Sequence, residues 1–174
     1  QELGSSVGVV FSSLAAKPGT EATPFVEKLQ GGKKLSPRNA VQYLKDFTAG
    51  MLSQTFDFRG PCVSMDAACA TGLYSIDYAI WMLRSQVSHV IVGGTDTPAL
   101  NDDMFIFNQL GALGTQSRPF DKNRDGFIMG EGAGCLLLEL ESTAIQRGAK
   151  ILGYIYDVSN RTDGADGGAT APDA

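Results

Sequence analysis

Seven residues, DAACATG from Asp66 to Gly72, surround a cysteine with small side chains. Cys69 follows a short strand-like stretch and begins an apolar run with helical spacing, so we expect it at a strand-to-helix turn. Unpaired N–H groups and the positive dipole at a helix start favour a thiolate there, and alanine and glycine give the turn room. The N–H of Cys69 could also donate to an oxyanion formed at a thioester carbonyl. These features are compatible with a nucleophile, but on the local pattern alone a small cysteine packed tightly at a helix start is the more common case.

The other two cysteines and the histidine have different surroundings. Cys62 and Cys135 lie within apolar, strand-like stretches, where we expect them to be buried and inert. The three cysteines form no CxxC pair, which argues against a disulfide framework and a zinc site and favours a reduced, cytoplasmic protein. The single histidine, His89, stands at the start of a predicted strand and is interpreted as a structural residue. The base that a nucleophilic Cys69 needs is therefore not predicted in this chain.

Composition limits the classes of function. The chain has 174 residues, 43% of them hydrophobic, which predicts one well-buried domain. Its net charge of −5 argues against nucleic acid and anionic membranes as general partners, although Lys33, Lys34 and Arg38 form a local basic patch. No apolar run reaches the roughly 18 residues of a membrane helix, and no secretory signal opens the sequence. Because it begins with Gln1 and ends in a loop-like GGATAPDA, both ends look like cuts.

Strand-like and helix-like stretches alternate along the chain. We expect strands at 5–12, 89–94, 132–140 and 151–159, a turn followed by a short strand within 58–66, and helices at 23–32, 36–54, 69–84, 101–110 and 142–150. The strands are continuously apolar, which is typical of a layered α/β fold whose sheet is covered by helices on both faces.

The stretch DKNRDGFIMGEG, residues 121–132, matches the opening of a calcium-binding EF-hand loop. The twelfth position should hold a bidentate glutamate, but Gly132 stands there and Glu131 comes one place early. A predicted strand also follows, where an EF-hand needs a helix. We therefore interpret this stretch as a structural turn and predict no metal site.

Several motifs occur together in one order. After FRGPCVSMD come DAACATG, VIVGGTDT, SRPFDKNRDGFIMGEGAG, RGAKILGYI and TDGADGGATAPD. In order and approximate spacing the chain resembles the β-ketoacyl synthases (ketosynthases), which are acyltransferases of fatty-acid and polyketide biosynthesis with the thiolase fold.

The resemblance implies a reaction and its residues. Cys69 falls on the family's acyl-accepting cysteine, which takes an acyl group from the phosphopantetheine thiol of an acyl carrier protein. A malonyl thioester then loses CO2, and its carbanion attacks the acyl-enzyme to give a 3-oxoacyl product. Phe107 matches a residue near the acyl pocket, and Thr170 matches one beside the pantetheine arm. The family uses no further cofactor and is dimeric, so we expect a homo- or heterodimer.

The resemblance covers residues 1–174 as one domain segment, the Cys-bearing N-terminal half of a ketosynthase. The family's two catalytic histidines and its second oxyanion donor belong to motifs that this sequence lacks. We therefore expect a mixed sheet and helices in an incomplete thiolase-like fold, completed by a second segment or chain, and no condensation by this chain alone. The alternatives are a non-elongating subunit, like a chain-length factor or scaffold, and a degradative thiolase. An intact Cys69 argues against the former, and GEGAG and RPFD argue against the latter.

Overall fold

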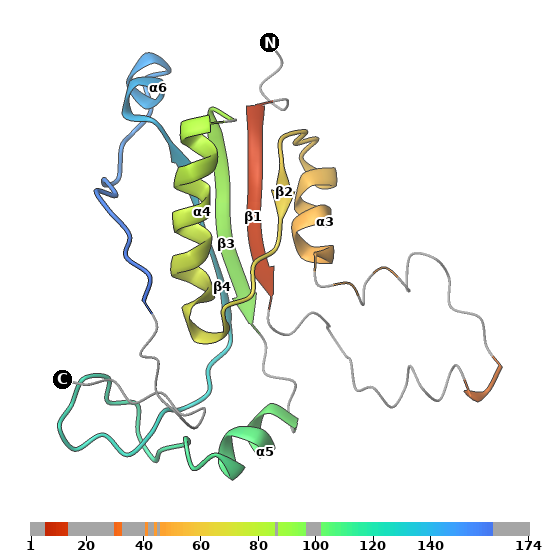
Figure 1. Ribbon diagram of the computed structural model, residues 1–174, viewed down its shortest axis with the longest axis vertical. Helices are drawn as coiled ribbons and strands as arrows, with labels where there is room; N and C mark the ends of the chain where they lie inside the picture. Colours follow the sequence, from red (N-terminus) through yellow and green to blue (C-terminus); the bar gives the residue numbers. More distant parts are fainter. Residues whose placement is uncertain are drawn as a thin grey trace.

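The computed structural model describes residues 6–13, 30–32, 41, 44, 46–85, 87–96 and 102–161. Its elements, in chain order, are β1 (Val7–Ser13), α3 (Phe47–Thr55), β2 (Cys62–Val63), the short 3-10 helix η2 (Ala68–Ala70), α4 (Thr71–Ser85), β3 (His89–Asp96), α5 (Asp102–Gln109), β4 (Gly132–Glu139) and α6 (Glu141–Gln146) (Figure 1). Within these residues the fold is the mixed α/β arrangement that the sequence predicts.

The four strands form one sheet in the order β2-β1-β3-β4. β1 runs parallel to both of its neighbours, and all seven of its residues pair with β3, from Val7 opposite His89 to Ser13 opposite Thr95. β4 is antiparallel to β3 along its whole length, with His89 opposite Glu139 and Asp96 opposite Gly132. The carboxyl ends of β1 and β3 therefore lie side by side (Figure 1).

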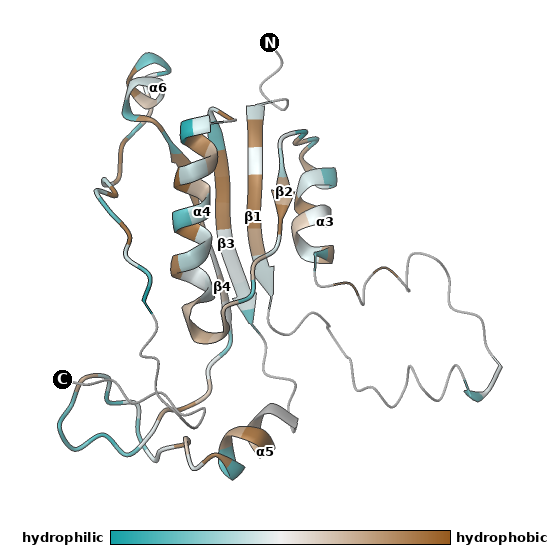
Figure 2. Cartoon of the chain, viewed as in Figure 1, coloured by the Kyte–Doolittle hydropathy of each residue, from teal (hydrophilic) through white to brown (hydrophobic). Residues whose placement is uncertain are grey.

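Helices α4 and α3 cover opposite faces of the sheet, because successive strand residues point to opposite sides. On one face, Val10 of β1 packs with Val90 and Val92 of β3 against α4, whose Met82 is fully buried. On the other face, Val9 and Phe11 pack against Ala49 of α3. Figure 2 shows the hydrophobic colour along β1 and the first part of β3, fading toward their carboxyl ends. The apolar core thus holds the sheet and leaves its carboxyl edge for polar and small residues.

One predicted strand is wrong. Residues 151–159 carry an apolar, strand-like sequence but pair with no strand among the described residues, and Leu152 and Tyr156 are 89% and 91% exposed. A strand needs a neighbour for its backbone hydrogen bonds, and here the segment has none. The other predicted strands and the helices at 69–84, 101–110 and 142–150 are confirmed with shifted ends, whereas helix 23–32 lies mostly outside the described residues.

Several large apolar side chains on α4 and β4 are exposed to solvent. Leu73 and Trp81 of α4 are 56% and 50% exposed, and Leu136 and Leu137 of β4 are 50% and 48% exposed. The complementary segment expected from the sequence stays a prediction. In the part of the chain that the structure describes, no helix combines the length and apolar character needed to cross a bilayer.

Candidate active site

Cys69 lies in η2, at the sharp turn between β2 and α4, and its side chain is exposed. The residue before it, Ala68, has φ +47°, a left-handed conformation that side chains with a Cβ rarely adopt. The turn leaves Cys69 exposed just before α4, at the strand-to-helix turn that the sequence predicts.

The segment that leads into the turn is tied to the carboxyl end of β1. The hydroxyl of Ser64 donates to the carbonyl of Phe11 at 2.8 Å, and the N–H of Met65 donates to the buried hydroxyl of Ser12 at 3.0 Å. These bonds fix the entry of the chain into the turn beside the sheet edge.

Two adjoining hollows meet at Cys69. One, of about 290 Å³, has polar groups in its wall, including Ser12, Thr71, Thr95 and Asp96. The other, of about 520 Å³, runs along an apolar wall. That wall includes Leu73 and Ile76 of α4, Val92 of β3 and Leu136 of β4. The thiol thus stands where the two hollows meet, and hydroxyl and carboxylate side chains line only the first of them.

Glycines bring β1, β3 and β4 close together beside the thiol. Both hollows are lined by Gly93 and Gly94 of β3 and by Gly134 of β4. A Cβ built on Gly93 would come 2.3 Å from the carbonyl oxygen of Gly134, while one on Gly94 would come 3.2 Å from the carbonyl oxygen of Ser12. The sequence marks these glycines only as the end of a strand, but β3 continues through them to Asp96.

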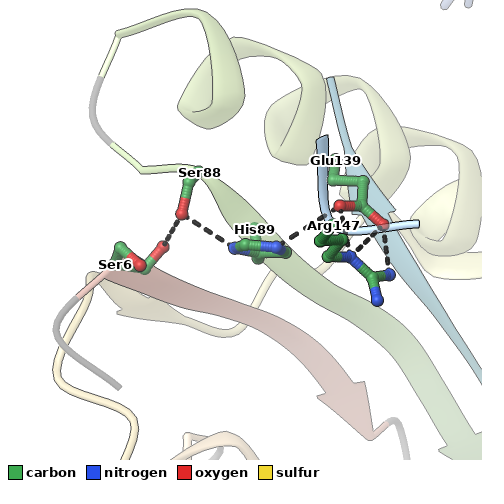
Figure 3. Close-up of polar contacts among 5 residues, drawn as sticks. All are labelled: Ser6, Ser88, His89, Glu139 and Arg147. Atoms are coloured by element: carbon green, nitrogen blue, oxygen red, sulfur yellow. Dashed lines mark hydrogen bonds and ion pairs between the residues drawn. The ribbon is translucent and has the colours of Figure 1, made fainter. Parts of the chain in front are cut away.

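His89 does not lie in this site. It begins β3, whereas the hollows are lined from Val92 onward, so four residues of extended strand, about 13 Å, separate His89 from Gly93. Figure 3 shows it between Ser88, whose hydroxyl lies 2.7 Å from Nδ1, and Glu139, whose Oε2 lies 3.3 Å from Nε2. The Arg147 guanidinium donates to the same carboxylate, with Nε 2.9 Å from Oε2. His89 is thus part of a buried polar cluster on a central strand, and not the edge or capping residue that its place at a strand start suggests.

This cluster also changes a pKa. Hydrogen bonding by Arg147, assisted by its charge and by His89, holds the pKa of the Glu139 carboxyl below its usual range, although burial opposes the shift. The cluster joins β3 to β4 and α6 at the end of the sheet remote from Cys69.

Of the two predicted substrate-binding residues, one is described. Phe107 lies in α5, half-buried, with its ring edge-on to that of Phe127 at a centroid distance of 5.1 Å. Helix α5 lies beyond the carboxyl ends of β1 and β3, at the same end of the sheet as the turn into α4, but Phe107 does not line either hollow (Figure 1). Thr170 lies outside the described residues, so both assignments stay predictions.

The stretch that resembles an EF-hand loop forms a turn that is hydrogen-bonded within itself and to the residues just before it. Asp125 accepts bonds from the N–H and hydroxyl of Thr115, at 3.0 and 2.6 Å, and from the Arg118 guanidinium at 3.2 Å. These bonds, the Thr115 hydroxyl first, lower the pKa of Asp125 to about 2. Asp121 accepts from the N–H of Asn123 at 2.7 Å. Both carboxylates therefore close the loop, which agrees with a structural turn.

The expected burial of the other two cysteines is wrong. Cys62 and Cys135 are both exposed, because β2 and β4 are the edge strands of the described sheet. Partial burial raises the pKa of the Cys62 thiol, with the charge of Asp46 acting in the same direction and a hydrogen bond from Ser53 opposing it.

Sequence reasoning missed Thr71, the first residue of α4 and only 7% exposed. Its hydroxyl accepts from the N–H of Ala67 at 2.8 Å and donates to the carbonyl of Ala68 at 2.7 Å. The signal was available, because threonine at a predicted helix start commonly bonds to neighbouring backbone groups.

The chain is similar in sequence and in fold to known proteins. Residues 1–144 match the family model described as Beta-ketoacyl synthase, N-terminal domain. The 3-oxoacyl-[acyl-carrier-protein] synthase 2 of Vibrio harveyi is 34% identical over 194 aligned residues, covering 100% of this chain and 46% of that protein.

Two solved structures share the fold. A β-ketoacyl synthase from Burkholderia phymatum STM815 superposes with a TM-score of 0.72 at 28% identity, covering 86% of this chain and 39% of that one. The ishigamide ketosynthase/chain length factor superposes with a TM-score of 0.70 at 28% identity, covering 85% and 38%. The fold is thus thiolase-like, and the chain spans less than half the length of these relatives.

Proposed function

The chain belongs to the β-ketoacyl synthase family, and we propose that Cys69 is the acyl-accepting nucleophile of a 3-oxoacyl synthase. The observation that carries this proposal is the position of Cys69, exposed on a tight turn at the start of α4 where two hollows meet. A cysteine kept only for packing has no reason to be held in such a turn.

The first step is transthioesterification. The Cys69 thiolate attacks the carbonyl carbon of an acyl thioester, and a new C–S bond forms while the carbonyl oxygen becomes negative. The first turn of α4 follows Cys69 in the chain, and the N–H groups of a helix start carry the partial positive charge that an oxyanion needs. When the carbonyl re-forms, the bond to the carrier thiol breaks, the thiolate leaves and takes up a proton, and the acyl group stays on Cys69.

The two hollows suit the two parts of such a substrate. An acyl chain fits the apolar wall formed by Leu73, Ile76 and Leu136, where its burial is favourable. The amides of a pantetheine arm fit the wall that holds Ser12, Thr95 and Asp96, which offers hydrogen-bonding groups. This division sets the thioester carbonyl at Cys69, between the two.

Condensation is the second step, and it needs groups beyond those around Cys69. A malonyl thioester loses CO2, the resulting carbanion attacks the acyl carbonyl, and the Cys69–acyl bond breaks to release the 3-oxoacyl product. The only histidine of the chain, His89, lies at the other end of β3. The histidines that this step uses in the family therefore come from another segment or chain, and residues 1–174 alone are not expected to condense.

The carrier is an acyl carrier protein, which is the carrier of the similar 3-oxoacyl-[acyl-carrier-protein] synthase 2 of Vibrio harveyi. The growing thioester then arrives on phosphopantetheine, and the protein needs no cofactor of its own. A homo- or heterodimer in the cytoplasm, acting in fatty-acid or polyketide biosynthesis, completes the proposal.

The test is a condensation assay on the full-length protein with an acyl-carrier and a malonyl-carrier thioester. We expect a 3-oxoacyl product from the wild type and none from Cys69→Ala. Cys62→Ala is the matched control, because Cys62 is also exposed but lies on β2 outside both hollows. Product formation by Cys69→Ala at the wild-type rate would refute the proposal.

A non-elongating subunit is the second candidate, favoured by the likeness to the ishigamide ketosynthase/chain length factor. Such a subunit has no nucleophilic task. If Cys69 takes up no acyl group in the full-length protein, while a partner condensing subunit makes longer products in its presence, this second candidate replaces the first.

A further inference from the structure

The turn that carries Cys69 holds a residue in an unfavourable conformation. Ala68 has φ +47°, and its Cβ makes this region costly, whereas glycine would adopt it freely. Such a conformation persists only where neighbouring contacts enforce it. Here these contacts are hydrogen bonds to the backbone on either side of Ala68.

The hydroxyl of Thr71 makes two of these contacts at once. It accepts from the N–H of Ala67 at 2.8 Å and donates to the carbonyl of Ala68 at 2.7 Å, so it bridges the backbone on both sides of the left-handed residue. The N–H of Ala70 closes the same turn on the carbonyl of Ala67 at 3.1 Å. Cys69 lies between these tied positions, and it is exposed together with Ala68 and Ala70.

Burial makes the two bonds of Thr71 difficult to replace with water. Its side chain is at the start of α4 and the residue is only 7% exposed. A hydroxyl is the smallest group that can donate and accept together, and serine offers the same group while valine offers neither role. Removing the hydroxyl leaves the N–H of Ala67 without this acceptor and weakens the hold on Ala68, which then keeps only the Asp66 carboxylate on its N–H at 3.5 Å and the Thr71 N–H on its carbonyl.

We propose that Thr71 is a positioning residue for Cys69: its hydroxyl holds Ala68 in the left-handed conformation and thereby fixes the direction of the thiol at the helix start. This inference rests on the proposed function in that Cys69 is the nucleophile, but it concerns a residue to which that function assigns no role. A residue that merely stabilised α4 would alter unfolding and leave the reactivity of Cys69 unchanged in the folded protein.

The experiment compares Thr71→Val and Thr71→Ser in the full-length protein. Alkylation by iodoacetamide is followed as a function of pH, peptide by peptide, so that Cys69 and Cys62 are measured in the same sample. Acyl transfer to Cys69 from a short-chain acyl N-acetylcysteamine thioester and the thermal midpoint are recorded in parallel.

We expect Thr71→Val to slow both reactions of Cys69 by about tenfold or more, because a small misplacement of a reacting group is costly. Cys62 keeps its alkylation rate, and Thr71→Ser returns Cys69 to within about threefold of the wild type. Wild-type alkylation and acylation of Cys69 in folded Thr71→Val would overturn the proposal.

A second variant separates the backbone effect from loss of the fold. In A68G/T71V the glycine accepts a positive φ at no cost, so the turn no longer needs to be held. Recovery of Cys69 alkylation relative to Thr71→Val supports the proposal, and the double variant also serves where Thr71→Val does not fold. A folded double variant whose Cys69 stays slow contradicts it. If wild-type Cys69 is alkylated normally but never acylated, the proposed function fails while the comparison among Thr71 variants still stands.

Discussion

Gly93 and Gly94 are adjacent in β3 and both line the site, yet the structure predicts opposite outcomes for alanine at the two positions. A Cβ on Gly93 would lie 2.3 Å from the carbonyl oxygen of Gly134 and 2.8 Å from the Cα of Cys135, both in β4. A Cβ on Gly94 would meet only the carbonyl oxygen of Ser12, at 3.2 Å. Neither glycine has a positive φ, so steric contact alone decides.

The size of each destabilisation depends on which atoms must move to make room for the new Cβ. Beside Gly93 the obstacle is the backbone of a paired strand, which cannot rotate away as a side chain does, so β3 and β4 must separate locally. Overpacking of this kind costs about 1–3 kcal/mol, and backbone contact puts Gly93→Ala near the upper end. Gly94→Ala requires a shift of a few tenths of an ångström, offset by the lower entropy of the unfolded alanine chain, for a net change under about 1 kcal/mol.

Hydrogen exchange of the full-length protein measures this difference where it arises. The free energy of opening is obtained for peptides from residues 89–96 and 132–139, which form the β3–β4 ladder. Gly93→Ala is expected to speed exchange of both strands strongly, and Gly94→Ala to leave them near the wild type. Equal exchange in the two variants would refute the contact argument.

Three further outcomes are expected. Met82→Ala, which empties the fully buried space between α4 and the sheet, costs about 2–4 kcal/mol in denaturant unfolding, and a loss below about 1 kcal/mol would show that the core is not packed as described. Glu139→Gln lowers thermal stability near neutral pH. Because Arg147 depresses the folded pKa of Glu139, their ion pair stabilises the fold fully above the unfolded pKa of about 4.3, so the stability difference from the wild type narrows as pH falls through the folded pKa; a pH-independent difference would contradict the ion-pair account. Charge reversal of Lys33, Lys34 and Arg38, which lie outside the described residues, slows acylation of Cys69 by an acyl carrier protein but not by a small thioester. An equal effect on both reactions would show that this basic patch does not dock the carrier protein.

The sequence predicted what depends on short-range pattern. Helical spacing located α4, continuous apolar runs located β1 and β3, and small residues around Cys69 indicated the turn that the structure contains. The place of His89 at the start of a strand also followed from sequence, whereas its contact with Glu139 across β3 and β4 did not.

What the sequence did not predict depends on partners that are far apart in the chain. Residues 151–159 have the composition of a strand, but pairing requires a neighbour, and none exists among the described residues. Cys62 and Cys135 look buried from their apolar surroundings, yet they lie on edge strands. The role of Thr71 depends on two backbone bonds and one positive φ, which composition does not reveal.

The central claim is that Cys69 accepts an acyl group, and intact-mass spectrometry tests it most directly. The full-length protein is incubated with an acyl thioester of a carrier protein and denatured. Its intact mass is measured, and the protein is then digested to identify the modified peptide. The account predicts a mass gain of one acyl group that maps to the peptide containing Cys69 and disappears in Cys69→Ala while persisting in Cys62→Ala. An unmodified Cys69, or an acyl group carried by Cys62 or Cys135 instead, would contradict it.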